Sequence, residues 1–392
     1  MIDSIVIAES GLSGFEQGLR TISDNTANLN TPGFKGAVEQ FSDMADGQTS
    51  TGDGSNFGQP GLGLDTLGTT LNFSAGTLQT TSNPLDLAIN GDGFFTLRDA
   101  QGDIHYTQDG QFNFNDAGTL VSTVTGEDVM ALDATHTLVP VSIAGLDNSA
   151  AQATSKVTFV GNLSAGATTD TVSSIAVIDN AGTSHSLSLT LIPDTTTAGK
   201  WDLTLQDGST TVGTSSIAFS NGQVVAGSDT AAFTYTPAGS TAVNLTLDFS
   251  TDVTSSDSGT TSTLAVSNAD GFAEGQLTSK TFDSTGTLVL TYSNGQTVKK
   301  SQLALGQFVS SDDVVAANNN EFAAKDGHAW KKGVAGDGDF GQIQSSTLEA
   351  SNVDLSDEFS NLVIMQRGYQ ACSQVVSTAS DMLTALFGMM SK

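Results

Sequence analysis

The chain has 392 residues, which is too long for one compact core, so its length predicts two or three domains. It carries 13 Lys and Arg against 42 Asp and Glu, a formal net charge of −29, which argues against binding to nucleic acid or to an anionic membrane. The acidic excess is typical of a solvated exterior. A cation-binding surface is the alternative, although the sequence shows no ligand cluster for one.

Neither a cleaved signal nor a membrane span is predicted. The N-terminus lacks the basic segment, continuous apolar stretch and small-residue cleavage site of a secretory signal, and no run approaches the ~18 apolar residues of a transmembrane helix. Two options stay open, cytoplasmic residence or export by a route without a cleaved signal. The single cysteine, Cys372, excludes a disulfide within the chain and is expected to be a buried helix residue.

Residues 4–30 are predicted to form one helix, with Ser4 as the N-cap and Pro32-Gly33 as the stop. Apolar residues recur there every three or four positions, interrupted only at Thr26, which is typical of a coiled-coil seam. This stripe consists of Ile5, Ala8, Leu12, Phe15, Leu19, Ile22 and Leu29. Three glycines within the helix each cost about 1 kcal/mol against Ala, which predicts close approach by another helix. They are Gly11, Gly14 and Gly18.

The middle of the chain is predicted to be mainly β. Residues 42–71 are polar and Gly-rich and are interpreted as a connector. From about residue 72, short alternating runs separated by turn signals indicate the strands of a sandwich or barrel. The hairpin and turn signals are Asn221-Gly222, Asn294-Gly295, and the segments 116–119, 179–183 and 283–287.

The composition shifts near residues 146 and 276, and the stretch between them is rich in Ser, Thr and Ala. We interpret this stretch as an outer β domain inserted into an inner one. The predicted fold is therefore a multidomain α+β protein with discontinuous terminal coiled-coil helices and two mainly-β domains. Its parts are a helical domain of 1–41 and 355–392, an inner β domain of 72–145 and 277–354, and an outer β domain of 146–276.

The C-terminal segment is predicted to form a second long helix. Leu355 begins it, with Asn352 or Asp354 near its cap. Its apolar stripe is unbroken, as in a coiled-coil seam. This stripe consists of Leu362, Met365, Tyr369, Cys372, Val376, Ala379, Leu383, Leu386 and Met390. A β body with one apolar helix stripe at each end favours a subunit that polymerises through these stripes.

No catalytic, cofactor-binding or metal site is predicted. The segment 337–341 faintly resembles the start of a calcium loop but lacks the later ligands and the closing Glu, so a polar turn is favoured. No P-loop, dinucleotide fingerprint or nucleophile elbow is present, and nothing in the sequence supports an enzyme. The four histidines lack metal-ligand spacing. They are His105, His136, His185 and His328.

Four separated segments resemble signatures of the flagellar rod and hook proteins. An Asn-rich helix end leads into Thr-Pro-Gly-Phe-Lys at 31–35, and a second match spans 83–95. A third covers 106–112, and the last spans 348–355 with Gln-Arg-Gly-Tyr-Gln at 366–370. The residues that carry the resemblance are Asn25, Asn28, Gly33, Phe34, Lys35, Asn90, Gly91, Gly93, Phe94, Phe95, Ser351, Asn352, Val353, Gln366, Arg367 and Tyr369.

The insertion 146–276 resembles the hook members of this family, because rod members are shorter. The resemblance implies a structural subunit of the bacterial flagellar hook, whose copies polymerise into a curved hollow tube. That tube is a universal joint for motility, passing torque from rod to filament, with terminal helices lining its inside. Implied partners are further copies, the distal rod, the hook cap, the hook–filament junction and the hook-length control protein. Type III export is implied as well.

Two alternatives stay open. One is a distal rod subunit of the same family, which would differ by its position in the assembly. The other, from a different class, is a secreted β-rich adhesin. An adhesin would need ligand-binding aromatic residues in the outer domain, where Trp201 is the only Trp and is expected to fill a β core.

Overall fold

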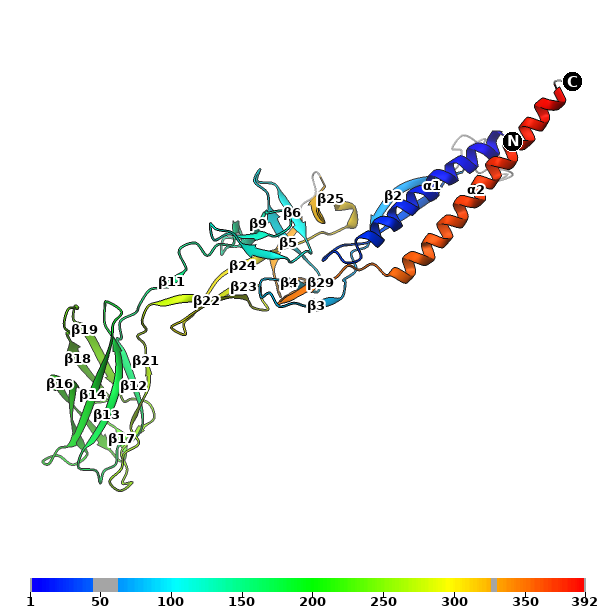
Figure 1. Cartoon of the computed structure of the whole chain (residues 1–392). Coiled ribbons are helices and arrows are strands. Elements are labelled where there is room, and N and C mark those ends of the chain that lie inside the picture. Colours follow the sequence, from blue (N-terminus) through cyan, green and yellow to red (C-terminus); the bar gives the residue numbers. More distant parts are fainter. Residues whose placement is uncertain (1, 45–62, 326–329, 391–392) are drawn as a thin grey trace, which may run out of the picture. The chain divides into compact units, whose positions relative to one another are not determined.

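The computed structural model describes residues 2–44, 63–325 and 330–390. Over these residues a helix at each end flanks a middle made mostly of strands (Figure 1), as the sequence predicted. The helices are α1 (Ile2–Ala27) and α2 (Leu355–Met390). Within the described part of the chain, neither helix has a stretch long and apolar enough to cross a membrane.

Helix α1 differs from its prediction at both ends. It already includes Ile2, so Ser4 lies inside the first turn and is not the N-cap. It ends at Ala27, and the amide of Leu29 donates to the carbonyl of Thr26, an i→i−3 bond that tightens the chain after the last helical turn. Leu29 therefore lies beyond the helix and cannot continue its seam.

Helix α2 begins where the sequence predicted. Of the two proposed caps, Asp354 is the one used, because its Oδ1 accepts a hydrogen bond from the amide of Ser356 at 2.7 Å. Asp357 and Glu358 follow in the first turn, where negative charge is favoured by the helix dipole. The other candidate, Asn352, bonds to strand segments instead.

The connector predicted for residues 42–71 is wrong at its C-terminal end. There β2 (Leu64–Leu71) pairs antiparallel with β1 (Ala37–Asp43), in the register Ala37↔Leu71 to Asp43↔Leu64. The glycine content of the whole stretch hid the threonines Thr66, Thr69 and Thr70, a residue type that is enriched in strands. Residues 45–62, which contain most of the glycines of the predicted connector, lie outside the described residues.

The chain divides into two compact units. Unit 1 comprises Met1–Ala144, Lys280–Val289 and Lys299–Lys392, and unit 2 comprises Gly145–Ser279 and Leu290–Val298. Three long strands have residues in both units: β22 (Gly275–Phe282), β23 (Thr287–Tyr292) and β24 (Thr297–Gln307).

Unit 1 contains helices α1 and α2, the β1–β2 hairpin and a set of short strands. In sheet order β24 is followed by β9, β5, β6, β26 and β25, with β7, β8, β10 and β27 at its sides. Two small pairs, β28–β4 and β29–β3, complete the unit. The bounds are β3 (Leu78–Thr80), β4 (Leu87–Asn90), β5 (Phe94–Arg98), β6 (Ile104–Thr107), β7 (Phe112–Phe114), β8 (Leu120–Ser122), β9 (Asp128–Leu132), β10 (Leu138–Pro140), η1 (Ser311–Asp313), β25 (Val314–Ala316), β26 (Glu321–Ala324), β27 (Lys331–Val334), β28 (Gln342–Ser345) and β29 (Thr347–Glu349).

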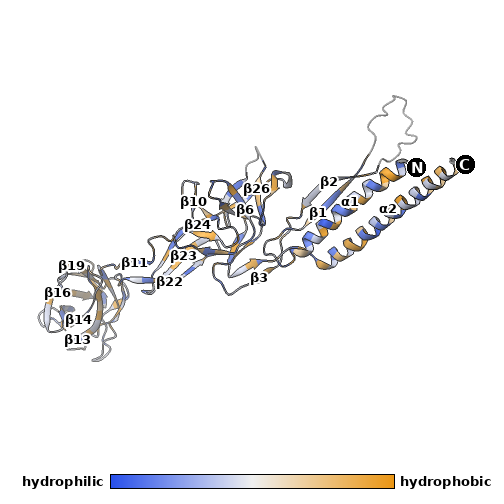
Figure 2. Ribbon diagram, turned by 45° about the horizontal axis from the view of Figure 1, so that its top comes forward, coloured by the Kyte–Doolittle hydropathy of each residue, from blue (hydrophilic) through white to orange (hydrophobic). Residues whose placement is uncertain are grey.

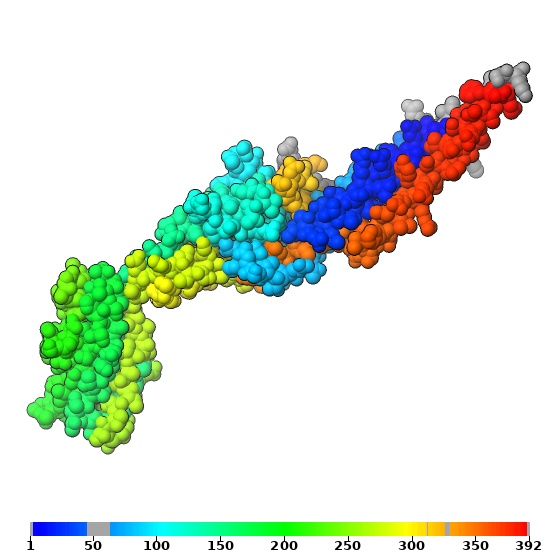
Figure 3. All heavy atoms as spheres, in the orientation of Figure 1, coloured from blue at the N-terminus to red at the C-terminus, as the bar shows by residue number. Residues whose placement is uncertain are grey.

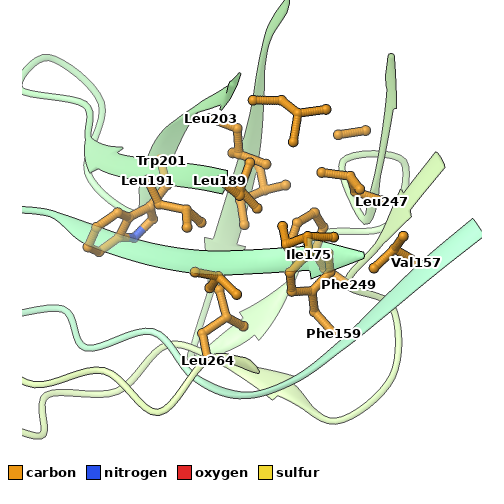
Figure 4. Packing of buried hydrophobic residues seen from close by; sticks show 14 of the residues in the cluster. Val157, Phe159, Ile175, Leu189, Leu191, Trp201, Leu203, Leu247, Phe249 and Leu264 are labelled. Atoms are coloured by element: carbon orange, nitrogen blue, oxygen red, sulfur yellow. The ribbon is translucent and has the colours of Figure 1, made fainter. Parts of the chain in front are cut away.

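Unit 2 is a single 10-stranded sheet folded around one core, shown from close by in Figure 4. Alternate residues of its strands point inward, and Trp201 is buried among them, as expected for a core residue. The bounds are β11 (Asn148–Ser149), β12 (Lys156–Asn162), β13 (Asp170–Ile178), β14 (Ser184–Pro193), β15 (Lys200–Asp207), β16 (Thr210–Ser220), β17 (Gln223–Val224), β18 (Thr230–Tyr235), β19 (Val243–Asp248), β20 (Val253–Thr254) and β21 (Ala265–Ala269); β11 pairs with β22 outside this sheet.

The predicted turn signals lie where strands reverse. Asn221 and Gly222, both at positive φ, form a two-residue hairpin between β16 and β17. Asp179 closes the turn between β13 and β14, because its carboxylate accepts the amides of Ala181 and Thr183. Side chains that satisfy turn amides explain why such Asp-to-Thr segments could be recognised without a structure.

Candidate functional site

The terminal helices pack against each other along an antiparallel seam made close by glycines. A Cβ added at Gly11 would lie 2.9 Å from Cys372 Sγ, and one at Gly18 would lie 3.1 Å from Met365 Sδ. One added at Gly368 would lie 2.5 Å from the Phe15 ring. The predicted close approach of a helix is therefore confirmed at the first two, and Figure 3 shows α1 against α2.

The third predicted glycine meets a strand. A Cβ on Gly14 would lie 2.5 Å from Leu64 Cδ2 of β2, and Phe41 of β1 contacts the same face. The ring of Phe41 lies 6.5 Å from that of Phe15. The β1–β2 hairpin thus covers one side of α1, a partner that the prediction of residues 42–71 as a connector had left out.

The two predicted stripes differ in how far the chain covers them. Ala8 and Ile22 are buried, and Ile5, Leu12, Phe15 and Leu19 are half-buried. On α2, Leu362, Met365, Cys372, Val376 and Leu383 are half-buried and Ala379 is buried. Tyr369 and Leu386 are each 41% exposed, and for Tyr369 the reason is that the seam passes through its neighbour Gly368.

The motif segments of the two ends meet at a point that we call the motif junction, formed by Asn25, Gly33, Lys35, Glu349 and Asn352. At its centre Lys35 Nζ lies 2.8 Å from Glu349 Oε1, with side chains only 1% and 2% exposed. Two opposite charges that have lost their water must be paired. The pair therefore joins the segment after α1 to the strand before α2.

Two asparagines extend this junction. The Asn25 side chain donates to the carbonyl of Ala37 and to Glu358 Oε1, and accepts from the amide of Ala37. Asn352 accepts from the amide of Gly36 at 2.8 Å and donates to the carbonyl of Asn72 at 2.7 Å. Each side-chain amide thus links three segments by using both its oxygen and its NH2 group. An ionised Asp would lack the donor.

The junction requires glycine at position 33, because of its backbone conformation and because of the close approach of another segment. Its φ is +66°, and a Cβ there would lie 2.5 Å from the amide nitrogen of Asp109. Asp109 is itself nearly buried, and burial raises its pKa to about 6 despite a hydrogen bond from the amide of Gln111. The 106–112 motif is thereby placed directly against the 31–35 motif.

The remaining motif residues serve several local purposes. Gly91 and Gly93, at φ +120° and +139°, form the turn between β4 and β5. Phe94 belongs to an aromatic cluster with Tyr106, Phe322 and Trp330, whereas Phe95 packs against Phe112. Placed elsewhere are Asn28, which donates to the carbonyl of Asp24; Phe34, which is half-buried; Asn90, paired with Gln342; Ser351, which accepts from Val353; and the exposed Gln366 and Arg367.

Several partners of these residues could not be singled out from the sequence. Glu349 and Asp109 lie within the motif segments 348–355 and 106–112, and Glu358 lies in the first turn of α2. A possible signal was the presence of a lysine within an otherwise apolar and glycine-containing motif, because a buried lysine needs a carboxylate partner. The position of that partner, more than 300 residues away, is set by the fold alone.

The spacing of the histidines in the sequence did not indicate that one of them, His105, lies beside two carboxylates. His105 Nδ1 lies 2.9 Å from Glu127 Oε1 and 3.6 Å from Glu321 Oε2. Burial opposes the charged imidazole, but the hydrogen bond and charge of Glu127, with the charge of Glu321, raise the pKa of His105. Linear spacing hid the cluster because β6 and β26 pair across the fold.

The segment 337–341 and the histidines His185 and His136 have local explanations. Residues 337–341 form tight turns in which the amide of Phe340 donates to the carbonyl of Asp337, so the predicted polar turn is confirmed. Asp339 lies 3.2 Å from Lys331 Nζ. His185 pairs with Asp179 at 3.1 Å, and His136 lies at a turn with φ +59°. His328 lies outside the described residues.

Comparison with known proteins decides the family. The model "Flagella basal body rod protein" matches residues 5–35, "Flagellar hook protein FlgE/F/G D1 domain" matches 88–158, and "Flagellar basal body rod FlgEFG protein C-terminal" matches 344–389. The chain is 30% identical to the flagellar hook protein FlgE of Salmonella typhimurium strain LT2 over 411 residues, covering 97% of this chain and 98% of that one. This chain belongs to the flagellar hook protein FlgE family.

Other relatives agree with this assignment. The hook protein FlgE of Escherichia coli K12 is 29% identical over 97% of this chain and 98% of its own length. The crystal structure of Helicobacter pylori flagellar hook protein FlgE2 matches with a TM-score of 0.53 and 12% identity, covering 69% of this chain and 100% of that chain, which supports the fold alone. As a FlgE protein, the chain is a structural subunit of the flagellar hook, and the predicted resemblance is confirmed.

Proposed function

We propose that this FlgE subunit polymerises through its terminal helices into a curved tube that serves as a universal joint between rod and filament. The role is mechanical and not catalytic. The seam within one chain would hold α1 against α2, and a further apolar surface would hold neighbouring copies together. In this proposal the first surface is formed by the predicted stripe residues of α1 from Ile5 to Ile22 and of α2 from Leu362 to Leu383, except the exposed Tyr369.

One observation carries the proposal: α2 has a second apolar stripe, beside the seam, that the chain itself leaves exposed. Its members recur at helical spacing, so they share one side of α2. Figure 2 shows hydrophobic stretches along α2 among hydrophilic ones. They are Ile364 at 62% exposure, Val375 at 46%, Met382 at 49%, Leu386 at 41% and Met389 at 75%. An apolar surface of this length in a very acidic chain is typical of a protein interface.

A groove lies along part of this second stripe. It has a volume of about 510 Å³ and is lined by Ser4 of α1 and by residues of α2 from Ala371 to Met382. Apolar side chains dominate its walls, which suits the side chains of another helix. A helix of a second copy is the occupant we propose, because each copy carries the same exposed apolar stripe on α2.

The test is a pair of charge substitutions on α2. Met382→Asp places a charge in the second stripe, where it would need to lose its water on assembly, whereas Ser377→Asp lies about 140° around the same helix. We expect Met382→Asp to give folded monomers without tubes and Ser377→Asp to give tubes. Negative-stain microscopy and circular dichroism would measure this. Normal tubes from Met382→Asp would disprove the interface.

The layers of the tube follow from the same proposal. The helices, with residues 1–41 and 355–392, would line the inside, and the β1–β2 hairpin would lie with them because it packs on α1. Residues 72–145 and 277–354 would form a middle layer, and 146–276 an outer one. The proposed partners are the distal rod, the hook cap, the hook–filament junction and the hook-length control protein, with export through the flagellar type III channel.

A further inference from the structure

The cluster of His105, Glu127 and Glu321 gathers three possible metal ligands from separate strands. His105 lies on β6, Glu127 directly precedes β9, and Glu321 is the first residue of β26. Their ligand atoms lie within 4.8 Å of one another. Over residues 2–44, 63–325 and 330–390, it is the one group of three such side chains close enough to share an ion.

Glu321 is only partly satisfied where it stands, by the Thr125 hydroxyl and the His105 imidazole. Its side chain is 7% exposed, and its Oε1 has no hydrogen-bond partner among the described residues. Glu127 is 14% exposed and faces the same imidazole. A buried carboxylate oxygen without a donor is costly, and buried polar atoms of this kind usually have a partner such as an ion or a water.

The surroundings add negative charge and little positive charge. Asp99 is close enough to act on both His105 and Glu321. Arg98, on the adjacent strand β5, lies 4.0 Å from Asp128. One imidazole therefore stands against three carboxylates, a combination that a divalent cation would neutralise and that a single proton on His105 would not.

We propose that His105, Glu127 and Glu321 bind a divalent transition-metal cation of the zinc type. One imidazole nitrogen and two carboxylate oxygens form a donor set that Zn²⁺ accepts, with water in a fourth position. Zn–N and Zn–O bonds of about 2.0–2.2 Å at tetrahedral angles hold neighbouring ligand atoms about 3.4 Å apart. The observed separations of 2.9 and 3.6 Å from His105 Nδ1 bracket that value.

The site has room for water and for entry. A cavity of about 360 Å³ lies beside Glu127 and is lined by Arg98, Asp99 and Gly126 among others. Glu127 is the one proposed ligand among its lining residues, so the cavity gives a hydrated ion a path to that carboxylate. The ligands themselves need little movement, because His105 and Glu321 are already fixed by the pairing of β6 with β26.

Binding would clamp the sheet of unit 1. The three ligands span the strand order β9, β5, β6 and β26, so one ion would add a link between strands that already share backbone hydrogen bonds and the aromatic cluster of Phe94, Tyr106 and Phe322. This proposal does not depend on the polymer interface, because its ligands lie in the sheet and not on the helices. Its predicted effect is a more stable unit 1, whether or not the subunits polymerise.

The chain supplies a matched control in His185. That histidine also faces a carboxylate, with Nε2 3.1 Å from Asp179 Oδ2. Asp179, however, is already satisfied by the amides of Ala181 and Thr183, and no second carboxylate completes the set. His185→Gln should therefore leave metal binding unchanged.

The experiment uses untagged monomeric protein at pH 7.5, titrated with Zn²⁺ by calorimetry, with the melting temperature followed in parallel. We expect one Zn²⁺ per chain and a rise in melting temperature, because the ion binds only the folded state. Glu321→Gln and His105→Gln should each weaken binding at least about tenfold, and His185→Gln should bind as wild type. Mg²⁺ should bind far more weakly, because it prefers oxygen ligands only.

Folding is checked without metal. Glu321→Gln removes a poorly satisfied charge, so its melting temperature in chelator should equal or exceed that of wild type. If it falls, Glu127→Gln replaces it, and the visible spectrum of bound Co²⁺ reports whether an imidazole is a ligand. No saturable Zn²⁺ binding, or binding that survives the loss of His105 or of either glutamate, would overturn the proposal.

Discussion

Lys35 is a buried charge that the fold tolerates because Glu349 faces it. Glu349 Oε1 also accepts the amide of Gly76 at 2.6 Å, and Lys35 Nζ also donates to the carbonyl of Ser74 at 2.9 Å. The pair thus joins three segments, which are the one that follows α1, residues 74–76, and β29. Such an arrangement fixes the register of the segments more than it adds stability, because two desolvated charges gain little over an apolar pair.

Lys35→Met should destabilise unit 1 by about 3–5 kcal/mol, because it leaves the Glu349 carboxylate buried without its counter-charge. Adding Glu349→Gln should recover part of that loss, since the amide oxygen can still accept from Gly76. Urea unfolding followed by Trp330 fluorescence would measure it, in a Trp201→Phe background that silences unit 2. If the double variant is as unstable as the sum of the single ones, the two side chains are not coupled.

Asp109 should make unit 1 less stable as pH rises. Burial raises its pKa to about 6, above the ordinary value of 3.8, so the folded state holds the proton more tightly than the unfolded chain. Its stabilising effect is complete below about pH 4 and is lost as pH rises through 6. Asp109→Asn keeps the acceptor for the amide of Gln111 and should remove this dependence.

The gain of Asp109→Asn over wild type should therefore grow between pH 4 and pH 7, by about 2–3 kcal/mol for a shift of two pKa units. Comparing the two proteins at each pH cancels groups such as His105 that titrate in both. Trp330 fluorescence in urea is again the measurement. A difference that stays constant across this range would show that Asp109 is ionised at pH 5 in the folded chain.

At the scale of the element, the helix pair depends on glycine. Helix α1 lies close to α2 because Gly11, Gly18 and Gly368 leave room for Cys372, Met365 and Phe15 respectively. Glycine weakens an isolated helix by about 1 kcal/mol, so each helix needs the other to be stable. This coupling suits a subunit whose ends gain full order when they pack.

Gly368→Leu should separate the helices, because even its Cβ would lie 2.5 Å from the Phe15 ring. We expect lower helix content in the monomer and faster proteolysis of both ends, although leucine favours helix more than glycine does. Gly388→Leu is the matched control, since a Cβ there meets nothing within 4 Å. Circular dichroism and limited proteolysis would show it, and equal behaviour of the two variants would contradict the proposed seam.

Local patterns predicted what is local in this fold. The apolar step predicted both helices, the glycines predicted close approach, and Asn-Gly and Asp-to-Thr segments predicted turns. The choice of Gly368 over Tyr369 in the seam could not be predicted, because it depends on the distance between two helix axes. The partners of Lys35 and His105 could not be predicted either, because they arrive on strands paired over hundreds of residues.

At the scale of the whole molecule, we propose that the 10-stranded sheet of unit 2 is an insertion in the chain. Its apolar core is formed by its own strands, from Val157 to Leu264. The chain enters and leaves it side by side, because Gln152 and Phe272 form an antiparallel bridge with amide-to-carbonyl distances of 2.8 and 3.0 Å. Such an insertion can be removed without stretching the chain that remains.

Deleting residues 153–271 and joining Gln152 to Phe272 with a Gly-Ser-Gly linker should therefore leave unit 1 folded and able to form tubes. The tubes should be straighter than wild type, because polar contacts between outer domains are easily exchanged and are proposed to set curvature. Cells carrying the variant should swim poorly. Electron microscopy and a motility assay decide it: loss of all tubes would place unit 2 in the assembly contacts, and unchanged curvature with normal swimming would refute its proposed role.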